Sequence, residues 1–186
     1  MSKGLEIGAR FPDFVLPDEN GTRHRLSTLQ GEDSMVLHLS RGEHCPRERM
    51  HHRELLRFHE LCSVAFTQLV SLLPNTLHDV YKMKISTGAH WTFLADEDLE
   101  VREALDIGEY TDTHHDNAVV PHTLILAPGL VIDRVYVGYW FWGRPSVDQL
   151  WADLGDLHRR IKPDFDPTVA EVREAWEAER AVGARA

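Results

Sequence analysis

Apolar residues along the chain form short runs typical of buried strands, and these runs are separated by stretches with helical spacing. The runs predict strands at 35–40, 66–73, 90–96, 119–126 and 131–140. Between and after the strands, apolar spacing predicts helices from Pro46 to about 65 and at 77–84, 97–105 and 148–161. Strands that alternate with helices are typical of an α/β domain in which helices cover a sheet.

Turn and capping residues support these boundaries. The stretch "APGL" at 127–130 has Pro and Gly where a type II turn needs them, so the last two strands should form a hairpin. Ser146 and Gln149 fit a capping box at the start of the last domain helix. The segment 14–29 is predicted to lie at an edge, with a turn at Asn20 and Gly21.

The C-terminal residues are predicted to form a separate extension. "KPDFDP" at 162–167 breaks the chain, and Thr168 with Glu171 offers a second capping box. We therefore divide the chain into a domain at 1–162 and a helical extension at 163–186. One narrow apolar face would be formed by Val169, Val172, Trp176 and Val182. We favour packing of this helix on its own domain, and the alternative is contact with a second subunit in a homodimer.

Composition and charge narrow the class of protein. The 186 residues, 42% of them hydrophobic, suffice for one globular domain with a full core. A formal net charge of -10 argues against nucleic acid or an anionic membrane as partner. No signal peptide and no membrane-spanning run is recognisable. With only two cysteines, the protein is expected to be cytoplasmic, with both thiols reduced at rest.

Candidate chemistry is concentrated in "RGEHCPRERMHH", residues 41–52, directly after the apolar run "MVLHL". Pro46 is favoured at the first position of a helix, which places Cys45 at the N-cap. Unpaired N–H groups and the positive end of the helix dipole there favour a thiolate, and Arg41, Arg47 and Arg49 would add to that field. We interpret Cys45 as a reactive cysteine; the alternative is a buried, inert one.

Four stretches carry a resemblance to a known family. They are "IGARFPDFVLPDENGTRHRLSTLQG", "RGEHCP", "FLADEDLEVREALDI", and "VVPHTLIL" followed by "VIDRVYVG". Together they resemble a peroxiredoxin-like member of the alkyl hydroperoxide reductase and thiol-specific antioxidant family. This resemblance covers about residues 4–158. It implies a thioredoxin-like fold, with a central mixed β-sheet flanked by helices.

The resemblance also implies roles for single residues. Cys45 would be the catalytic thiol, helped by Arg41, His44, Glu48 and Pro121. The substrate-binding residues would be Gly42, Pro46, His122 and Arg144. No metal and no cofactor are expected to take part in the reaction.

The sequence departs from the family pattern at three positions. His38 and Gly42 stand where the family has Pro and Thr, and Pro121 stands where it has an arginine. As in thioredoxin-like oxidoreductases, Pro121 is expected to follow a cis peptide bond and to face Cys45. Glu48 keeps the family's Cys-Pro-x-Glu arrangement.

Cys62 is predicted to be a core residue. Along one helix, a rise of about 1.5 Å per residue separates it from Cys45 by some 25 Å. A disulfide needs Cα atoms within about 7 Å. An external thiol or another subunit would therefore have to resolve an oxidised Cys45.

The twelve histidines leave three interpretations open. Most of those near the cysteine are expected to be surface residues. A proton-handling role beside the thiol and metal binding by cysteine with histidines are the alternatives. The histidines concerned are His44, His51, His52, His114, His115 and His122.

The aromatic run "YWFW" before Gly143, Arg144 and Pro145 has two interpretations. We favour core packing at the end of the sheet. Otherwise Trp140 or Trp142 would form an apolar lid over the site, and Arg144 would supply the charge missing at Pro121.

The function predicted from these features is reduction of peroxides through Cys45, with an external thiol as reductant. Exchange with a protein or small-molecule disulfide is the alternative within the same chemistry. From a different class, the chain could be a non-catalytic thioredoxin-like binding module such as a metal carrier.

Overall fold

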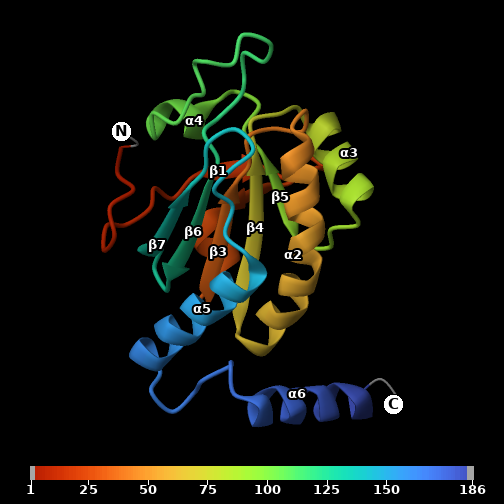
Figure 1. Cartoon of the computed structure of the whole chain (residues 1–186), viewed down its shortest axis with the longest axis vertical. Helices are drawn as coiled ribbons and strands as arrows, with labels where there is room; N and C mark the ends of the chain where they lie inside the picture. The colour runs from red at the N-terminus through yellow and green to blue at the C-terminus, as the bar shows by residue number, and fades with distance from the viewer. Residues whose placement is uncertain (1–2, 184–186) are drawn as a thin grey trace.

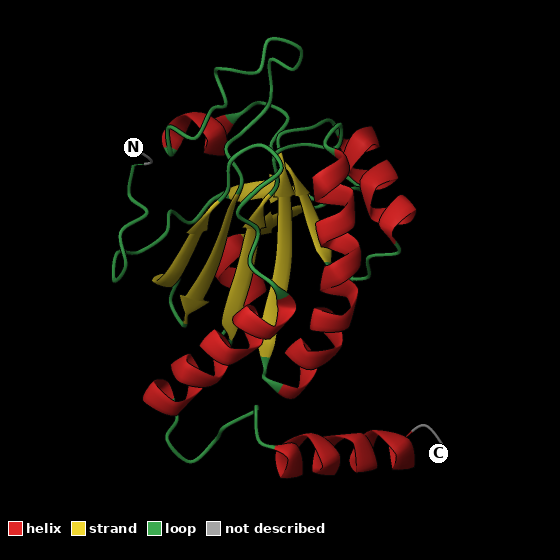
Figure 2. Ribbon diagram, in the orientation of Figure 1, coloured by secondary structure: helices red, strands yellow, loops and turns green. Residues whose placement is uncertain are grey.

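The computed structural model describes residues 3–183 and shows a five-stranded sheet covered by helices on both faces (Figures 1 and 2). The strands lie in the order β5-β4-β3-β6-β7. β3, β4 and β5 are parallel, whereas β6 and β7 are antiparallel to their neighbours, so the sheet is mixed as predicted. Their bounds are β3 Ser34–Leu39, β4 Thr67–Leu73, β5 Thr92–Ala95, β6 His122–Ala127 and β7 Val131–Val137.

The helices divide between the two faces. One apolar core lies under α2 (Pro46–Val64), α3 (Leu77–Thr87) and α5 (Val147–Ile161). The other lies under the N-terminal segment, α1 (Leu26–Gln30) and α4 (Glu100–Ala104). The segment predicted at an edge forms a separate antiparallel pair, β1 (Val15–Pro17) and β2 (Arg23–Arg25).

The central strand β3 has all six of its residues buried, because the sheet is covered on both faces. Side chains alternate between faces along a strand. Leu37 and Leu39 belong to the core on the α4 face, whereas Val36 belongs to the core beneath α2. His38 shares the parity of Val36 and so points toward α2, which brings a polar side chain into the interior beside that helix.

Most predicted boundaries are confirmed. Cys45 is the N-cap of α2 and Pro46 its first residue. Ser146 caps α5, where its hydroxyl accepts a hydrogen bond from the Gln149 N–H at 3.1 Å. Gly129 has a positive φ of 80°, as the third residue of a type II turn requires.

Two local predictions are wrong. Thr168 does not cap the last helix, because α6 begins at Ala170 and the Thr168 hydroxyl donates instead to the Asp166 carboxylate at 2.5 Å. The apolar spacing that predicts α2 runs through Met50, Leu55, Phe58, Leu61 and Ala65, but Met50 is 54% exposed and so does not lie on the buried face. The first half of α2 buries polar residues instead, and these form the site described below.

The extension helix α6 (Ala170–Gly183) contacts α2 across the lower end of the domain in Figure 1. A groove between the two helices is lined by residues such as Leu61 and Val64 of α2 and Trp176 of α6. Trp176 and Val172 are half-buried, so the helix packs on its own domain as we favoured. The side chain of Val182 lies outside the described residues. The division of the chain at 162 stays a prediction.

None of the helices in the described part of the chain combines the length and the apolar run that a transmembrane helix needs.

Candidate active site

Cys45 lies at the junction of β3 and α2, as predicted, but it is buried, with 1% of its surface exposed. No side chain forms a capping hydrogen bond at this end of the 19-residue helix. The thiol therefore stands next to the positive end of the helix dipole without a competing acceptor from a capping side chain. Cys45 is buried, as the inert alternative required, yet it lies at the N-terminus of a helix, where the helix dipole favours a negative charge.

Gly42 determines how the loop before Cys45 is folded. Its φ is 140°, and a Cβ at this position would meet the His44 ring at 2.7 Å. A side chain at Gly42 is therefore excluded by both the backbone conformation and the imidazole. The role predicted for Gly42 was substrate binding; what the structure shows is that it makes room for His44.

Glu48 and Arg144 form a fully buried ion pair one turn into α2. Two guanidinium nitrogens of Arg144 donate to Glu48 Oε1, and the side chains are 1% and 0% exposed. Glu48 Oε2 pairs with His38 Nε2 at 2.7 Å, so both carboxylate oxygens are occupied. Burial alone would raise the pKa of Glu48, but His38 and Arg144 hold it well below its ordinary value.

Two further histidines of α2 pack around this pair. His52 Nδ1 donates to the Glu48 carbonyl at 2.8 Å, and its Nε2 accepts from Ser71 Oγ at 3.1 Å. Burial lowers the pKa of His52 to about 4 and that of His51 well below its ordinary value. Both rings are therefore neutral at pH 7, and the expectation of surface histidines is wrong for them.

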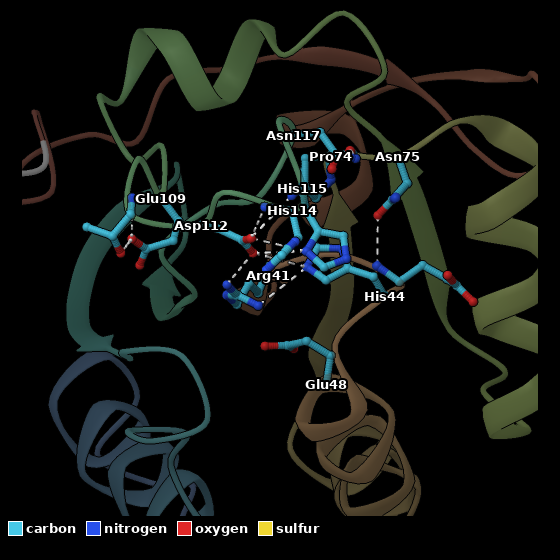
Figure 3. Close-up of polar contacts among 12 residues, drawn as sticks. Arg41, His44, Glu48, Pro74, Asn75, Glu109, Asp112, His114, His115 and Asn117 are labelled. Atoms are coloured by element: carbon cyan, nitrogen blue, oxygen red, sulfur yellow. Dashed lines mark hydrogen bonds and ion pairs between the residues drawn. The ribbon is translucent and has the colours of Figure 1, made fainter.

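Arg41 forms a second buried pair on the other side of the loop (Figure 3). Its Nη2 donates to Asp112 Oδ2 at 2.6 Å, and its Nη1 donates to His44 Nε2 at 3.4 Å. Asp112 also accepts from the His114 N–H at 2.9 Å and from His115 Nδ1 at 3.1 Å. Despite burial, these donors and the Arg41 charge lower the pKa of Asp112 to about 2.

His44 is neutral in this network. Burial, with the charges of His115 and Arg41, lowers its pKa to about 4. Because its Nε2 accepts from Arg41, the ring offers neither a positive charge nor a free lone pair on that nitrogen at pH 7. His44 therefore has no positive charge with which to stabilise a thiolate at pH 7.

The aromatic run after β7 forms the outer wall of this region. The Arg41 guanidinium lies 4.7 Å from the centre of the Trp140 ring, a cation–π contact. Phe141 and Trp142 are 50% and 75% exposed, so the core interpretation is wrong for them. The lid interpretation fits Trp140, which covers Arg41. Arg144 donates to the carbonyls of Trp140 and Trp142 and so ties this turn to Glu48.

Pro121 and His122 lie where β6 begins. No peptide bond among the described residues is cis, so the cis bond expected before Pro121 is wrong. The Pro121 carbonyl accepts from the Gly138 N–H, and His122 Nδ1 donates to the Val120 carbonyl at 2.7 Å. His122 is buried beside Leu39 of β3 and is not a surface residue.

Cys62 is a core residue, as predicted. It is 1% exposed and packs with Phe58 of α2 and Leu69 of β4. Burial raises the pKa of the Cys62 thiol. It lies near the far end of α2, which separates it from Cys45.

His44, Asp112 and His115 could in principle supply a metal ion with three ligand atoms, which lie within 4.8 Å of one another. Their geometry does not suit one. The two imidazoles are stacked, with centroids 3.6 Å apart and planes 9° from parallel. Since each lone pair lies in its ring plane, both cannot point at one ion. The Asp112 carboxylate also already accepts a hydrogen bond from Arg41, which a metal ion would have to displace.

Comparison with known proteins places this arrangement in a family. The sequence profile of the AhpC/TSA family matches residues 7–135, more than half of the chain. The chain belongs to the AhpC/TSA family. It is accordingly a thiol-based antioxidant oxidoreductase, as predicted. No curated protein sequence matches it.

Solved structures agree on the fold of this AhpC/TSA protein. Peroxidoxin BcpB from Mycobacterium tuberculosis has a TM-score of 0.70 at 18% identity, covering 85% of this chain and 99% of its own. Reduced Prx3 from Vibrio vulnificus in complex with H₂O₂ has 0.72 at 17%, covering 80% and 98%. A putative thiol:disulfide interchange protein DsbE from Chlorobium tepidum has 0.61 at 18%, covering 81% and 99%. At these identities the likeness establishes the thioredoxin-like fold.

The structure brings together Arg41, His44, Glu48 and Arg144 around the loop that carries Cys45. Sequence reasoning missed Asp112, the partner of Arg41 from a loop 71 residues away, and the buried role of His38. A polar residue inside the apolar run "MVLHL" is a signal that could have identified His38. Asp112 lies in a polar loop with other acidic residues, and nothing in the sequence singles it out.

The buried pair generates a stability prediction. Glu48→Gln should destabilise the fold by about 3–5 kcal/mol, because Arg144 would keep its charge in the interior without a partner. Urea unfolding at pH 7 measures this. Glu48→Leu combined with Arg144→Met should recover most of the loss. Glu177→Gln, which breaks an exposed pair with Arg173 on α6, is the control and should cost less than about 1 kcal/mol. A small cost for Glu48→Gln would contradict the importance of the pair.

The neutral histidines predict loss of stability in mild acid. The pKa values of His44 and His52, about 4, lie below the ordinary 6.5, so the unfolded chain binds more protons between these values. The free energy of unfolding should therefore fall as the pH drops from 6.5 toward 4, by about 3 kcal/mol for His52 alone.

Urea midpoints measured from pH 7 to pH 4 test this dependence on pH. His52→Gln should flatten the profile, whereas His78→Gln, an exposed histidine on α3, should leave it unchanged. Equal slopes for the wild type and His52→Gln would show that His52 is not held neutral by the fold.

The stacked imidazoles predict weak metal binding. Calorimetric titration of the reduced protein with zinc or copper should show no saturable binding at micromolar concentration, because His44 or His115 would first have to turn and Arg41 would have to release Asp112. His115→Ala is the matched variant. Tight, stoichiometric binding by the wild type that is lost in His115→Ala would instead support the metal-carrier alternative.

Proposed function

We propose that this AhpC/TSA protein reduces small hydroperoxides at Cys45. The observation that carries the proposal is the position of Cys45 at the uncapped N-terminus of α2, where Arg41 before it and Glu48 after it in the chain each belong to a buried arginine–carboxylate pair. The helix terminus favours the thiolate, which is the nucleophile in thiol chemistry. Arg41 lies in the loop that leads to Cys45, and its guanidinium is a charged hydrogen-bond donor there.

The proposed first step is attack of the Cys45 sulfur on the outer oxygen of the hydroperoxide. A sulfur–oxygen bond forms, the oxygen–oxygen bond breaks, and the leaving oxygen takes up a proton to depart as alcohol or water. Cys45 becomes a sulfenic acid. Arg41 Nε and Trp140 Nε1 are buried and have no hydrogen-bond partner among the described residues. In our proposal these donors bind the peroxide oxygens while charge develops on them.

The proposed reductant is an external thiol. It attacks the sulfenic sulfur, water leaves, and a second thiol then releases Cys45 and forms the disulfide of the reductant. Cys62 does not take this role in our proposal, because it is buried at the far end of α2. A cycle without a resolving cysteine requires free thiols in the surroundings, so we also propose a cytoplasmic location.

Burial of Cys45 also separates the proposal from its alternative. A protein disulfide must bring its own sulfur into line with the attacking sulfur, whereas only 1% of the surface of Cys45 is exposed. A small hydroperoxide needs far less space. Burial therefore supports peroxide reduction over protein disulfide exchange, with exchange as the second candidate. Neither peroxide reduction nor disulfide exchange, as proposed here, requires a homodimer.

Oxidation of the two cysteines in turn tests the function. After one equivalent of hydrogen peroxide, the wild type and Cys62→Ala should each gain the mass of one oxygen atom and form a dimedone adduct, and Cys45→Ser should gain neither. Addition of a small thiol before dimedone should restore the reduced mass. Oxidation of Cys45→Ser at the wild-type rate, or no oxidation of any form, would refute the proposal. Rapid reaction of Cys45 with an oxidised protein partner but not with peroxide would favour exchange.

A further inference from the structure

A second cavity lies at the opposite end of the sheet from Cys45. Its volume is about 380 Å³, and it is bounded by the start of β3, the end of α5 and the segment after α5. Ser34 is the first residue of β3, whereas Cys45 stands at the end of the loop that follows the last residue of this strand. Since six strand residues span roughly 20 Å, the cavity is separate from the site described above. A volume of this size is typical of pockets that bind small molecules.

Two of the residues that line this cavity each have a buried polar atom with no hydrogen-bond partner among the described residues. They are the hydroxyl of Ser34, which is 1% exposed, and Nε2 of His158, which is 5% exposed. A buried polar atom without a hydrogen bond destabilises the fold, so such atoms are rare and call for an explanation. Both belong to the same cavity, which suggests one shared partner that the chain itself does not provide.

Three aromatic rings contribute to the walls of the cavity. The Phe66 and Phe165 rings lie 5.6 Å apart with an angle of 58° between their planes, and the His158 ring meets Phe165 edge-on at 5.7 Å. Phe66 has a positive φ of 45°, which is uncommon for a bulky residue. Phe165 comes from the "KPDFDP" segment, which therefore does more than break the chain, because it places an aromatic ring over the cavity.

Charge at the cavity disfavours an anion. Burial lowers the pKa of His158, against the opposing effect of Asp166 and Asp33, so the ring is neutral at pH 7. Glu32 and Asp33 line the cavity as well, and Lys162 is the only cation among its lining residues that the structure describes. An uncharged ligand with an apolar ring and one hydrogen-bonding group matches this lining.

We propose that this cavity binds an uncharged hydroxyaromatic compound. Its ring would lie against Phe66 and Phe165, and its hydroxyl would donate to His158 Nε2 and accept from the Ser34 hydroxyl. One such group satisfies both orphaned atoms at once, because a hydroxyl is a donor and an acceptor. The site is distinct from Cys45 and is independent of the function proposed above.

Calorimetric titration with 1-naphthol tests the site. The wild type should bind one molecule per chain. Ser34→Ala and His158→Phe should each weaken binding about five- to tenfold, the effect of one lost hydrogen bond. The matched controls Ser86→Ala and His78→Phe change exposed residues on α3 and should bind like the wild type. Naphthalene should bind more weakly for want of a hydroxyl, and 1-naphthoate should not bind because it is charged.

A thermal melt guards against loss of fold in the variants. Ser34→Ala removes a hydroxyl without a partner, so its melting temperature without ligand should be no lower than that of the wild type. Peroxide oxidation of Cys45 should also be unchanged in this variant. No saturable binding of 1-naphthol to the wild type would overturn the proposal. So would binding that Ser34→Ala and His158→Phe leave intact, or naphthalene binding as tightly as 1-naphthol.

Discussion

The architecture around Cys45 depends on one buried carboxylate. Glu48 of α2 binds Arg144, which precedes α5, and His38, which lies in the central strand. The central strand and a segment 96 residues further along the chain therefore converge on a single side chain in the first turn of the helix that Cys45 caps. Moving two charges out of water costs several kcal/mol. The attraction between them offsets this cost only where their remaining hydrogen-bonding atoms also have partners. Here both carboxylate oxygens are occupied, and the guanidinium also binds two carbonyls.

A second buried pair, Arg41 with Asp112, gives the site its electrostatic character. Each arginine is matched by a carboxylate, and His44 and His52, whose pKa values are lowered to about 4, are neutral at pH 7. The pocket therefore holds charge without a large net excess of either sign. In such a setting the dipole of α2 and the unpartnered donor of Arg41 weigh more for a thiolate than the number of basic residues in "RGEHCPRERMHH" suggests.

Features that depend on local sequence could be predicted, whereas those that depend on distant partners could not. The strands, the turn at Gly129, the cap at Ser146 and the N-cap position of Cys45 follow from residues close together in the chain. The burial of His52 depends on Ser71, 19 residues away, and the place of Arg41 depends on Asp112. From sequence alone a polar residue is expected at the surface, because its burial depends on a hydrogen-bonding partner elsewhere in the chain that the local sequence does not identify.

The same reason explains the misread aromatic run. Four aromatic rings in a row normally indicate core, since burial of aromatic surface contributes strongly to stability. In this protein the turn they form is tied down through its carbonyls by Arg144, so the turn needs little help from apolar packing. Phe141 and Trp142 are left exposed and only Trp140 turns inward over Arg41.

The central strand β3 links the two ends of the molecule. Its C-terminal end leads into the loop of Cys45, and its N-terminal end carries Ser34. α5 runs along the same face, from Ser146, two residues after Arg144, to His158 near its end. The strand that brings His38 to Glu48 at one end, and the helix that follows Arg144, therefore also position the hydroxyl of Ser34 and the imidazole of His158 at the other end.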